Sequence, residues 1–599
     1  MISDQQAGPA AEYRRRLTAQ QALAGRLARR ERQISVARLG VFLAGGVVAF
    51  VAIDRHAVSP WWLAAPAVVF VTLVLFHDRV ITRRRRADRT VAFYEHGLAR
   101  ICDRWAGTGE RGERFLDPSH PYADDLDLFG RGSLFELLCT ARTRAGEDTL
   151  AAWLRAPAAA DVIRARHVAV RELRPLLDLR EDLAVLGVDV RAGLDPDALV
   201  SWAKATPTRA PQAVRVSAAA LVTLLVAVGL GWLAGLNGPL PVAAVLAAEL
   251  AVGASMRGRV LRVMHTVQRP GRDLRLLAQI LARLEGERFA APHLAQLRAA
   301  LDTDGRPPSV QIARLHRLIH LLDARQNQFF APLAALLLWT TQLALAIDAW
   351  HAANGAGVVR WLATVGEIEA LGAFAGYAYE HPNDPFPEIV ESSPTFDSAA
   401  LGHPLLPAEH CIRNDVRLGA DLRLLVVSGS NMSGKSTLLR TVGTNAVLAL
   451  AGAPVRAQRL HVSPLAVGAS IRLNDSLQAG TSRFYAEITR LRQLMDLASG
   501  PLPLLFLLDE ILHGTNSHDR GIGAAAVVRG FIERGAVGLV TTHDLALAHI
   551  ADTLDGRAVN VHFEDHLEDG KMIFDYRMRP GVVEKSNAVA LMRAVGLDV

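Results

Sequence analysis

The chain has 599 residues, a net charge of +6 at pH 7 and 50% hydrophobic residues. This length predicts several domains, and three scattered cysteines with no paired spacing exclude a cysteine-rich metal site and suit a reducing cytoplasm. The mean hydropathy of +0.19 is high for a soluble protein, so part of the chain is expected to lie in a non-aqueous environment.

The amino-terminal segment, residues 1–36, is polar and rich in arginine. A cleavable signal needs a small-residue cleavage site after an apolar core, and this segment contains neither feature. We therefore expect a basic cytoplasmic arm.

The apolar excess is concentrated in four nearly uncharged runs, arranged as two close pairs: Leu39–Ile53 with Pro60–Phe76, and Val216–Leu236 with Gly238–Ala254. A membrane-spanning helix needs about 20 apolar residues. The third run is long enough, the second and fourth are marginal, and the first needs its flanking arginines to reach the lipid headgroups. We expect two transmembrane hairpins, at 37–90 and 216–256. The alternative for each run is a helix buried in a large soluble core.

Arginines flank both pairs of runs on the sides away from their short links. The positive-inside rule then predicts a multi-pass protein of the cytoplasmic membrane, with both termini and every sizeable loop in the cytoplasm. Contact with anionic lipid accounts for the pI of about 9.5 as well as nucleic acid does. Membrane lipid is therefore an expected partner, and the basic charge is weak evidence for nucleic acid.

Glu249 is a carboxylate inside the fourth apolar run. Intramembrane carboxylates often mark function. Because Glu249 lies near the cytoplasmic end of the run, we favour the simpler expectation that it meets water or an arginine such as Arg215 or Arg257.

The segments 91–215 and 257–400 are expected to form a mostly helical core. A fifth apolar stretch, Phe329–Ile347, lies within the second of them and is interrupted by Pro332 and Gln342. We predict that this stretch is buried in protein rather than in lipid.

The segment from Gly429 to Ser436 fits G-x-x-x-x-G-K-[ST], the pattern of a phosphate-binding loop. A strand-like run, Leu422–Val427, precedes it, and a helix-compatible run, Ser436–Leu450, follows. Backbone N–H groups of such a loop point at phosphate oxygens, the lysine meets the β- and γ-phosphates, and the hydroxyl holds Mg²⁺. A chance Gly/Ser turn is the alternative. The predicted ATP-binding residues are Gly429, Ser430, Asn431, Met432, Ser433, Gly434, Lys435, Ser436 and Thr437.

Two further apolar runs end in polar residues. Leu504–Leu508 reads as a buried parallel strand that ends in Asp509 and Glu510. We expect Asp509 to steady the Mg²⁺ shell, through water, and Glu510 to polarise the attacking water. An acidic pair that only caps a following helix is the alternative. Ala536–Thr542 reads as another core strand.

With these motifs in view, the carboxyl-terminal third resembles the ATPase domain of the MutS mismatch-repair family. The loop of that family reads close to G-P-N-M-G-G-K-S-T, and Ser430 and Ser433 replace its proline and one glycine. Asp509 and Glu510 match its D-E pair. The same pattern continues with Gly514, Thr515 and Asp519. Further segments that resemble the family are Asn474–Asp475, Gly480–Glu487, His403–Pro404, Gly132–Leu138 and the tail Glu584–Ala588.

The resemblance implies a homodimer in which two ATPase domains complete each other's sites. The serine that matches Ser482 would reach the partner's nucleotide, although an ordinary helix N-cap is a compatible role. His543 matches a T-H switch motif, which implies that it senses the γ-phosphate or orders the attacking water. A purely structural histidine at the end of a strand is the alternative. Nothing before residue 120 resembles the mismatch-recognition domain, so mismatch recognition is not expected, and DNA binding stays open.

The fold class that follows is multidomain: an α-helical core with two transmembrane hairpins and a carboxyl-terminal α/β phosphate-loop domain at 401–599 with a largely parallel sheet. The leading function is a membrane-anchored, MutS-like ATPase that hydrolyses ATP to change its conformation. One alternative is a transport ATPase of the ABC class, although no L-S-G-G-Q-like signature precedes Asp509. Another is an ATP-switched membrane tether for DNA or for an unidentified protein partner.

Overall fold

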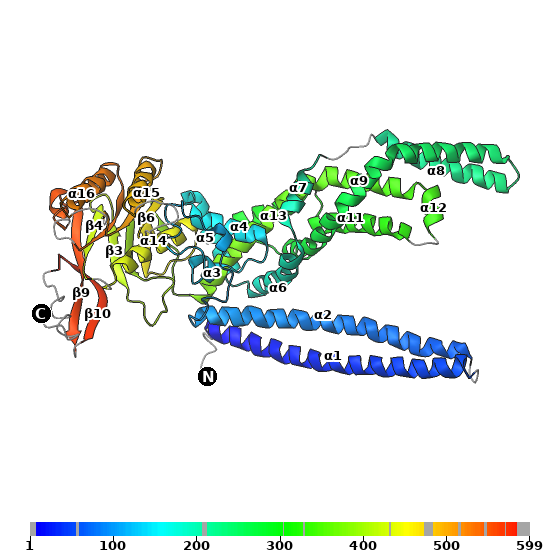
Figure 1. Ribbon diagram of the computed structural model, residues 1–599, viewed down its shortest axis with the longest axis horizontal. Helices are drawn as coiled ribbons and strands as arrows, with labels where there is room; N and C mark the ends of the chain where they lie inside the picture. Colours follow the sequence, from blue (N-terminus) through cyan, green and yellow to red (C-terminus); the bar gives the residue numbers. More distant parts are fainter. Residues whose placement is uncertain are drawn as a thin grey trace. The chain divides into compact units, whose positions relative to one another are not determined.

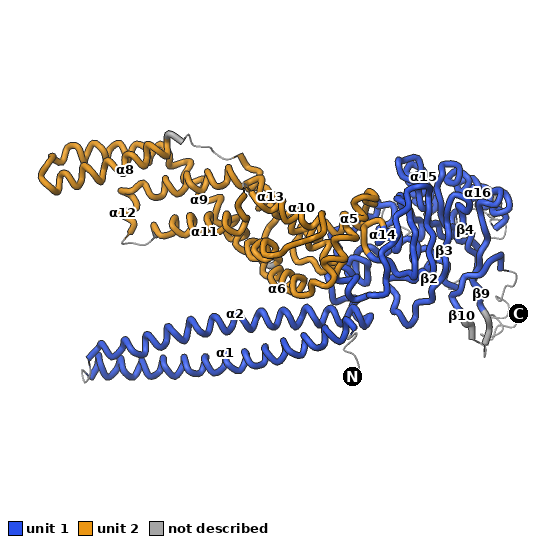
Figure 2. The backbone as a smooth tube through the Cα atoms, turned by 180° about the vertical axis from the view of Figure 1, so that it is seen from behind, with its two compact units in different colours: residues 1–138, 376–449, 454–599 blue, residues 139–375, 450–453 orange. Residues whose placement is uncertain are grey.

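The computed structural model describes residues 8–55, 59–206, 212–303, 305–326, 330–430, 433–472, 483–512, 517–543, 548–568 and 571–583. The chain divides into two compact units (Figure 2). Unit 1 comprises residues 1–138, 376–449 and 454–599, and unit 2 comprises residues 139–375 and 450–453.

Unit 1 combines a long helical hairpin with an α/β domain (Figure 1). Its helices are α1 (Pro9–Ile53), α2 (Ala64–Ile101), α3 (Leu134–Leu138), α14 (Lys435–Ala451), α15 (Arg483–Ala498) and α16 (Ser517–Glu533), with short 3-10 turns at Pro60–Leu63, Glu113–Phe115 and Ala551–Thr553. Its strands are β1 (Glu388–Ile389), β2 (Phe396–Leu401), β3 (Asn414–Leu418), β4 (Leu424–Ser428), β5 (Arg459–Val462), β6 (Ala466–Ser470), β7 (Leu504–Asp509), β8 (Val537–Thr542), β9 (Ala558–Glu568) and β10 (Lys571–Pro580).

Unit 2 is helical. Its helices are α4 (Arg144–Arg155), α5 (Ala160–Leu173), α6 (Leu177–Gly193), α7 (Pro196–Lys204), α8 (Gln212–Leu233), α9 (Pro239–Glu285), α10 (Pro292–Leu301), α11 (Pro308–Asp323), α12 (Ala331–Leu336) and α13 (Trp339–Glu380), with a 3-10 turn at Ala324–Gln326. The last residues of α13 belong to unit 1.

The α/β domain is built on a six-stranded sheet with the order β10-β9-β4-β8-β7-β6, in which only β10 is antiparallel to its neighbour. The expected largely parallel sheet is confirmed. The predicted strands at 422–427, 504–508 and 536–542 correspond to β4, β7 and β8, and the predicted helix at 436–450 corresponds to α14. A second sheet has the order β1-β5-β2-β3.

Helices cover both faces of the six-stranded sheet. One face carries α15 and α16, whose apolar residues share a buried core with β4, β7 and β8, including Leu494, Phe506 and Phe531. On the other face lies α14, where a Cβ atom built on Gly443 would be 2.7 Å from a methyl carbon of Leu507 and 2.5 Å from one of Leu126. Gly443 therefore allows α14 a close approach to the sheet.

Residues 102–138 belong to the α/β unit, although the sequence placed them in a helical segment at 91–215. Leu126 is fully buried against α14. Asp125 accepts hydrogen bonds of 2.7 Å from the backbone N–H groups of Ile471 and Arg472. These contacts join residues that are more than 300 positions apart, and for this reason no local pattern indicated them.

Four helices are long and apolar enough to cross a membrane in the described part of the chain: Pro9–Ile53, Pro60–Ile101, Val214–Leu233 and Pro239–Glu285. They overlap the four predicted apolar runs, although the third run extends three residues past its helix and the fourth begins one residue before its helix. Between 6% and 11% of the residues in each apolar window are buried, so the alternative of helices buried in a soluble core does not describe these windows. The membrane itself stays a prediction.

The predicted boundary between the basic arm and the first span lies inside a single helix, because α1 runs without a break from Pro9 to Ile53. The basic part of α1 packs along α2 through Leu27, Val80 and Ala87. An ion pair of 2.7 Å joins Arg84 to Glu31. The arm and the predicted span therefore form one continuous hairpin with α2.

The fifth apolar stretch is divided between α12 and α13. In the described part of the chain it is not among the helices that are long and apolar enough to cross a membrane. Leu343, Leu345 and Ile347 are buried, as predicted, whereas Leu333 and Leu336 are exposed. Position 329 lies outside the described residues.

The expected ion pair of Glu249 is absent from the described part of the chain. Glu249 is 3% exposed, and its Oε1 atom has no hydrogen-bond partner there. No contact within 4 Å joins it to Arg215 or Arg257 among the described ion pairs. The arginine part of the expectation is therefore not borne out among the described residues, because the carboxylate is buried away from these arginines. Contact with water stays a prediction.

The base of the α1–α2 hairpin is fixed to the end of α13 by a buried ion pair. Glu380 has a fully buried side chain and accepts hydrogen bonds from Arg100 at 2.5 and 2.6 Å and from the Tyr13 hydroxyl at 3.2 Å. Removal of one partner of a buried pair leaves the other charge without compensation, which costs about 3–5 kcal/mol.

We expect Arg100→Gln to lower the thermal unfolding midpoint of the detergent-solubilised chain by several degrees. Arg15→Gln is the matched control, since Arg15 also pairs with a glutamate on this hairpin but is 74% exposed. The control should unfold like the parent chain. Equal midpoints for the parent chain and both variants would contradict a structural role for the Arg100–Glu380 pair.

Candidate nucleotide-binding site

The phosphate-loop sequence connects β4 to the first turn of α14, as predicted. Gly429 and Gly434 have φ values of +150° and +106°, which are unfavourable for residues with a Cβ atom. A Cβ atom on Gly429 would also lie 2.7 Å from Ser433 Oγ and 3.1 Å from the carbonyl oxygen of Phe563. The loop therefore requires glycine at both positions. Asn431 and Met432 lie outside the described residues.

Several polar atoms of the loop are available to a ligand. The hydroxyl oxygens of Ser430 and Ser433 are buried and have no hydrogen-bond partner in the described part of the chain. Ser436 is half-buried in the first turn of α14, and Thr437 beside it is exposed. Unpaired buried hydroxyl groups are costly, so this arrangement fits a site that is completed by phosphate oxygens.

Lys435 lies at the centre of the site and is only 5% exposed. Its Nζ atom donates to the carbonyl oxygens of Gly429 and Ser430, at 2.9 Å each, and lies 3.3 Å from His543 Nε2 and 3.6 Å from Glu510 Oε1. Burial lowers the pKa of Lys435, and the nearby carboxylates of Glu510 and Asp509 partly offset this effect.

Strand register brings the other predicted residues to the same edge of the sheet. Ser428 of β4 is opposite Thr542 of β8, and Thr541 of β8 is opposite Asp509 of β7. Parallel strands end at a common edge, where α/β proteins place their ligands. Lys435, Asp509, Glu510 and His543 are therefore brought together, as predicted.

Glu510 is held in an unusual conformation. Its φ of +48° is uncommon for a residue with a side chain. Its N–H group donates to Thr541 Oγ1 at 3.0 Å, and its carboxylate is in close contact with His543 Nε2. Strained backbone is characteristic of functional sites, and here it directs the Glu510 carboxylate toward Lys435 and His543.

The sequence did not identify two residues that support this geometry. Thr541 donates its hydroxyl hydrogen to Asp509 while it accepts from the Glu510 N–H group, so it orients both acids. Glu487 is 2% exposed and accepts from the N–H group of Leu512, whose φ is +61°. Position 541 precedes the matched T-H pair and position 487 ends a matched segment, but neither pattern indicated these contacts.

The elements expected to reach a second copy are not placed by the structure. Ser482, Gly514, Thr515 and the tail from Glu584 to Ala588 lie outside the described residues. Asp519 lies in α16, and the position of its side chain is likewise not described.

The donor set fits Mg-ATP. A buried lysine and unpaired hydroxyl groups suit the phosphates, while the Ser436 hydroxyl and the Asp509 carboxylate are oxygen ligands of the kind Mg²⁺ prefers. Mg²⁺ bound with a nucleotide takes most of its ligands from water and phosphate, and one or two from protein. Accordingly, the described residues contain no group of three or more His, Cys, Asp or Glu side chains that could hold a metal alone.

Comparison with known proteins supports this assignment of the carboxyl-terminal domain. Residues 425–598 match the family model described as MutS domain V. The chain is 32% identical over 203 residues to the protein named endonuclease MutS2 of Thermus thermophilus, an alignment that covers 33% of this chain and 25% of that protein.

Two other relatives extend the comparison. The chain is 34% identical over 218 residues to DNA mismatch repair protein MutS 2 of Haloarcula marismortui, covering 36% of this chain and 23% of that protein. It is 32% identical over 232 residues to DNA mismatch repair protein MutS of Brevibacillus brevis, covering 38% and 26%. The matched part spans about a quarter of the length of these relatives. The carboxyl-terminal third is thus homologous to MutS and MutS2 proteins through their domain V, the ATPase domain.

Proposed function

We propose that the chain is a membrane-anchored, MutS-like ATPase that binds and hydrolyses ATP to drive a conformational change. The observation that carries this proposal is the meeting of Lys435, Glu510 and His543 at the carboxyl ends of β4, β7 and β8. A structural ion-pair network alone would not need the glycine-dependent loop beside it.

Each residue has a distinct task in this proposal. The loop N–H groups and the Lys435 ammonium group bind the triphosphate and neutralise its charge. Ser436 and Asp509 would hold Mg²⁺, which would supply positive charge to stabilise the phosphates. Glu510 accepts a proton from the attacking water. His543 holds the Glu510 carboxylate in place and orders the water.

The dimer and the membrane belong to the same proposal. Ser482 of one copy would reach the nucleotide of the other, so that ATP joins two ATPase domains and hydrolysis separates them. The apolar, largely exposed windows of α1, α2, α8 and α9 support two hairpins in lipid. Exposed apolar surface of this extent is unfavourable in water. We place the protein in the cytoplasmic membrane, with the ATPase domain and both termini in the cytoplasm.

DNA is a candidate partner, since the relatives include proteins named for DNA mismatch repair. We propose no recognition of mismatches, because the sequence before residue 120 does not resemble the mismatch-recognition domain. The match to MutS domain V also disfavours an ABC-class transporter. A tether that uses ATP to position DNA or a protein partner at the membrane stays compatible with the site.

A direct test uses the full chain, first fractionated without detergent and then purified in detergent. We expect the protein in the membrane fraction and ATP hydrolysis that depends on Mg²⁺. Hydrolysis should be measured with no DNA and with duplex, branched and single-stranded DNA over a range of salt concentrations, because phosphate contacts weaken steeply with ionic strength. A fully water-soluble chain would refute the membrane anchor, and failure to bind Mg-ATP would refute the ATPase.

A further inference from the structure

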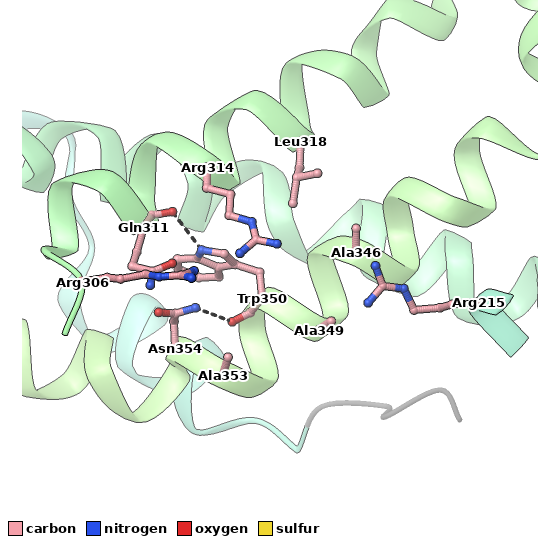
Figure 3. A pocket seen from close by; sticks show the side chains of 10 residues that line it. All are labelled: Arg215, Arg306, Gln311, Arg314, Leu318, Ala346, Ala349, Trp350, Ala353 and Asn354. Carbon is pink, nitrogen blue, oxygen red and sulfur yellow. Dashed lines mark hydrogen bonds between the residues drawn. The ribbon is translucent and has the colours of Figure 1, made fainter. Parts of the chain in front are cut away.

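Unit 2 contains a cavity of about 340 Å³ that the ATPase site does not use. Figure 3 shows that its walls come from α8, α11, α13 and the segment before α11. The lining residues are Arg215, Arg306, Gln311, Arg314, Leu318, Ala346, Ala349, Trp350, Ala353 and Asn354. The cavity is large enough for a small organic anion.

The walls carry three positive charges and no negative charge. Arg314 approaches from α11, Arg306 from the segment that precedes α11, and Arg215 from α8 (Figure 3). Among the described ion pairs, none joins these three side chains to a carboxylate. Three arginines without a counter-charge around one cavity favour an anion, and the guanidinium fork suits phosphate.

Two of the lining residues, Trp350 and Asn354, are held in place by hydrogen bonds. Trp350 donates from Nε1 to the backbone carbonyl oxygen of Gln311 at 2.9 Å, and this hydrogen bond joins α13 to α11. Asn354 donates from Nδ2 to the Trp350 carbonyl oxygen at 3.0 Å (Figure 3). Because this contact uses the amide nitrogen, the Asn354 oxygen is left as an acceptor.

Asn354 supplies the second observation that points to a ligand. Its side chain is 4% exposed, and its Oδ1 atom has no hydrogen-bond partner among the described residues. An unpaired buried acceptor is costly. A ligand that satisfies both it and the arginines carries an anionic group such as phosphate and, beside it, a hydrogen-bond donor such as a hydroxyl group.

We propose that this cavity binds a phosphate group that bears a neighbouring hydroxyl group, as in the glycerophosphate headgroup of an anionic phospholipid. Arg215 immediately precedes the apolar run of α8, which begins at Val216. Basic side chains at the cytoplasmic end of a span meet anionic headgroups. The lipid source rests on the proposed membrane anchor, whereas the phosphate-binding cavity does not.

The test is calorimetric titration of the full chain in a non-ionic detergent with three probes: dioctanoyl phosphatidylglycerol, dioctanoyl phosphatidylcholine and glycerol 3-phosphate. We expect phosphatidylglycerol to bind and phosphatidylcholine not to bind. The double variant Arg306→Gln/Arg314→Gln should weaken that binding by at least about tenfold, since each arginine supplies charge-assisted hydrogen bonds. Arg317→Gln is the matched control, because Arg317 is exposed on α11 but does not line the cavity.

The outcomes distinguish a phospholipid headgroup from a soluble phosphate compound as the ligand. If glycerol 3-phosphate binds, phosphatidylglycerol does not, and the double variant loses this binding, the cavity is a site for a soluble phosphate. That result would overturn the lipid source. Binding that is unchanged in the double variant occurs elsewhere, for example at the phosphate loop, and overturns the proposal. So does the absence of binding by both anionic probes. A Lys435→Met chain should bind the lipid like the parent, so failure of the ATPase proposal is detected separately.

Discussion

The Glu510→Gln variant is expected to bind Mg-ATP like the parent chain and to lose about 10²–10⁴-fold in hydrolysis rate. The amide keeps the shape of the carboxylate but cannot accept a proton from water. The backbone contact that fixes position 510, from its N–H group to Thr541 Oγ1 at 3.0 Å, does not involve the side chain. Steady-state phosphate release and binding of a fluorescent ATP analogue measure the two effects separately.

Glu533→Gln provides the control, because Glu533 is an exposed residue of α16 and is not part of the site. It should hydrolyse ATP at the parent rate. Retained turnover in Glu510→Gln would remove Glu510 from the mechanism. Loss of nucleotide binding together with turnover would instead show that the carboxylate acts mainly by holding Lys435 and His543, the two side chains it contacts.

The sequence predicted the parts of the site that local patterns determine. Buried parallel strands read as continuous apolar runs, so β4, β7 and β8 were located within two residues. The loop was recognisable because its glycines, lysine and hydroxyl each serve a fixed chemical purpose. The proximity of Asp509 to the loop then followed from the common edge of a parallel sheet.

Contacts made across long sequence separations could not be predicted in this way. The attachment of residues 102–138 to the α/β unit depends on Leu126 beneath α14 and on Asp125 at the end of β6, and neither has a distinctive sequence context. The positive φ of Glu510 is likewise set by its neighbours, since glutamate has no intrinsic preference for it. The burial of Glu249 required knowledge of which helix face packs inward.

Lys435 is the residue whose replacement should separate nucleotide binding from stability most clearly. Because burial lowers its pKa, the folded chain holds this proton less tightly than the unfolded chain does. The charged lysine therefore opposes folding in full below its folded pKa. This unfavourable contribution fades as the pH rises from the folded pKa to the unfolded pKa. Lys435→Met fills a similar volume without the charge, so the nucleotide-free variant should be no less stable than the parent.

The same variant should bind Mg-ATP about 10- to 100-fold more weakly, because a charge-assisted hydrogen bond to phosphate contributes about 1.5–3 kcal/mol. A ligand that binds only the folded state raises the unfolding temperature, so thermal unfolding with and without Mg-ATP measures both quantities in one experiment. We expect a clear rise in the unfolding temperature for the parent and for Lys204→Met, a control in α7 of unit 2, and little or none for Lys435→Met.

An equal rise in all three proteins would mean that the nucleotide binds elsewhere. A nucleotide-free Lys435→Met chain that unfolds well below the parent would mean that the lysine holds the loop through its contacts with Gly429 and Ser430, and that burial of its charge is not the dominant effect.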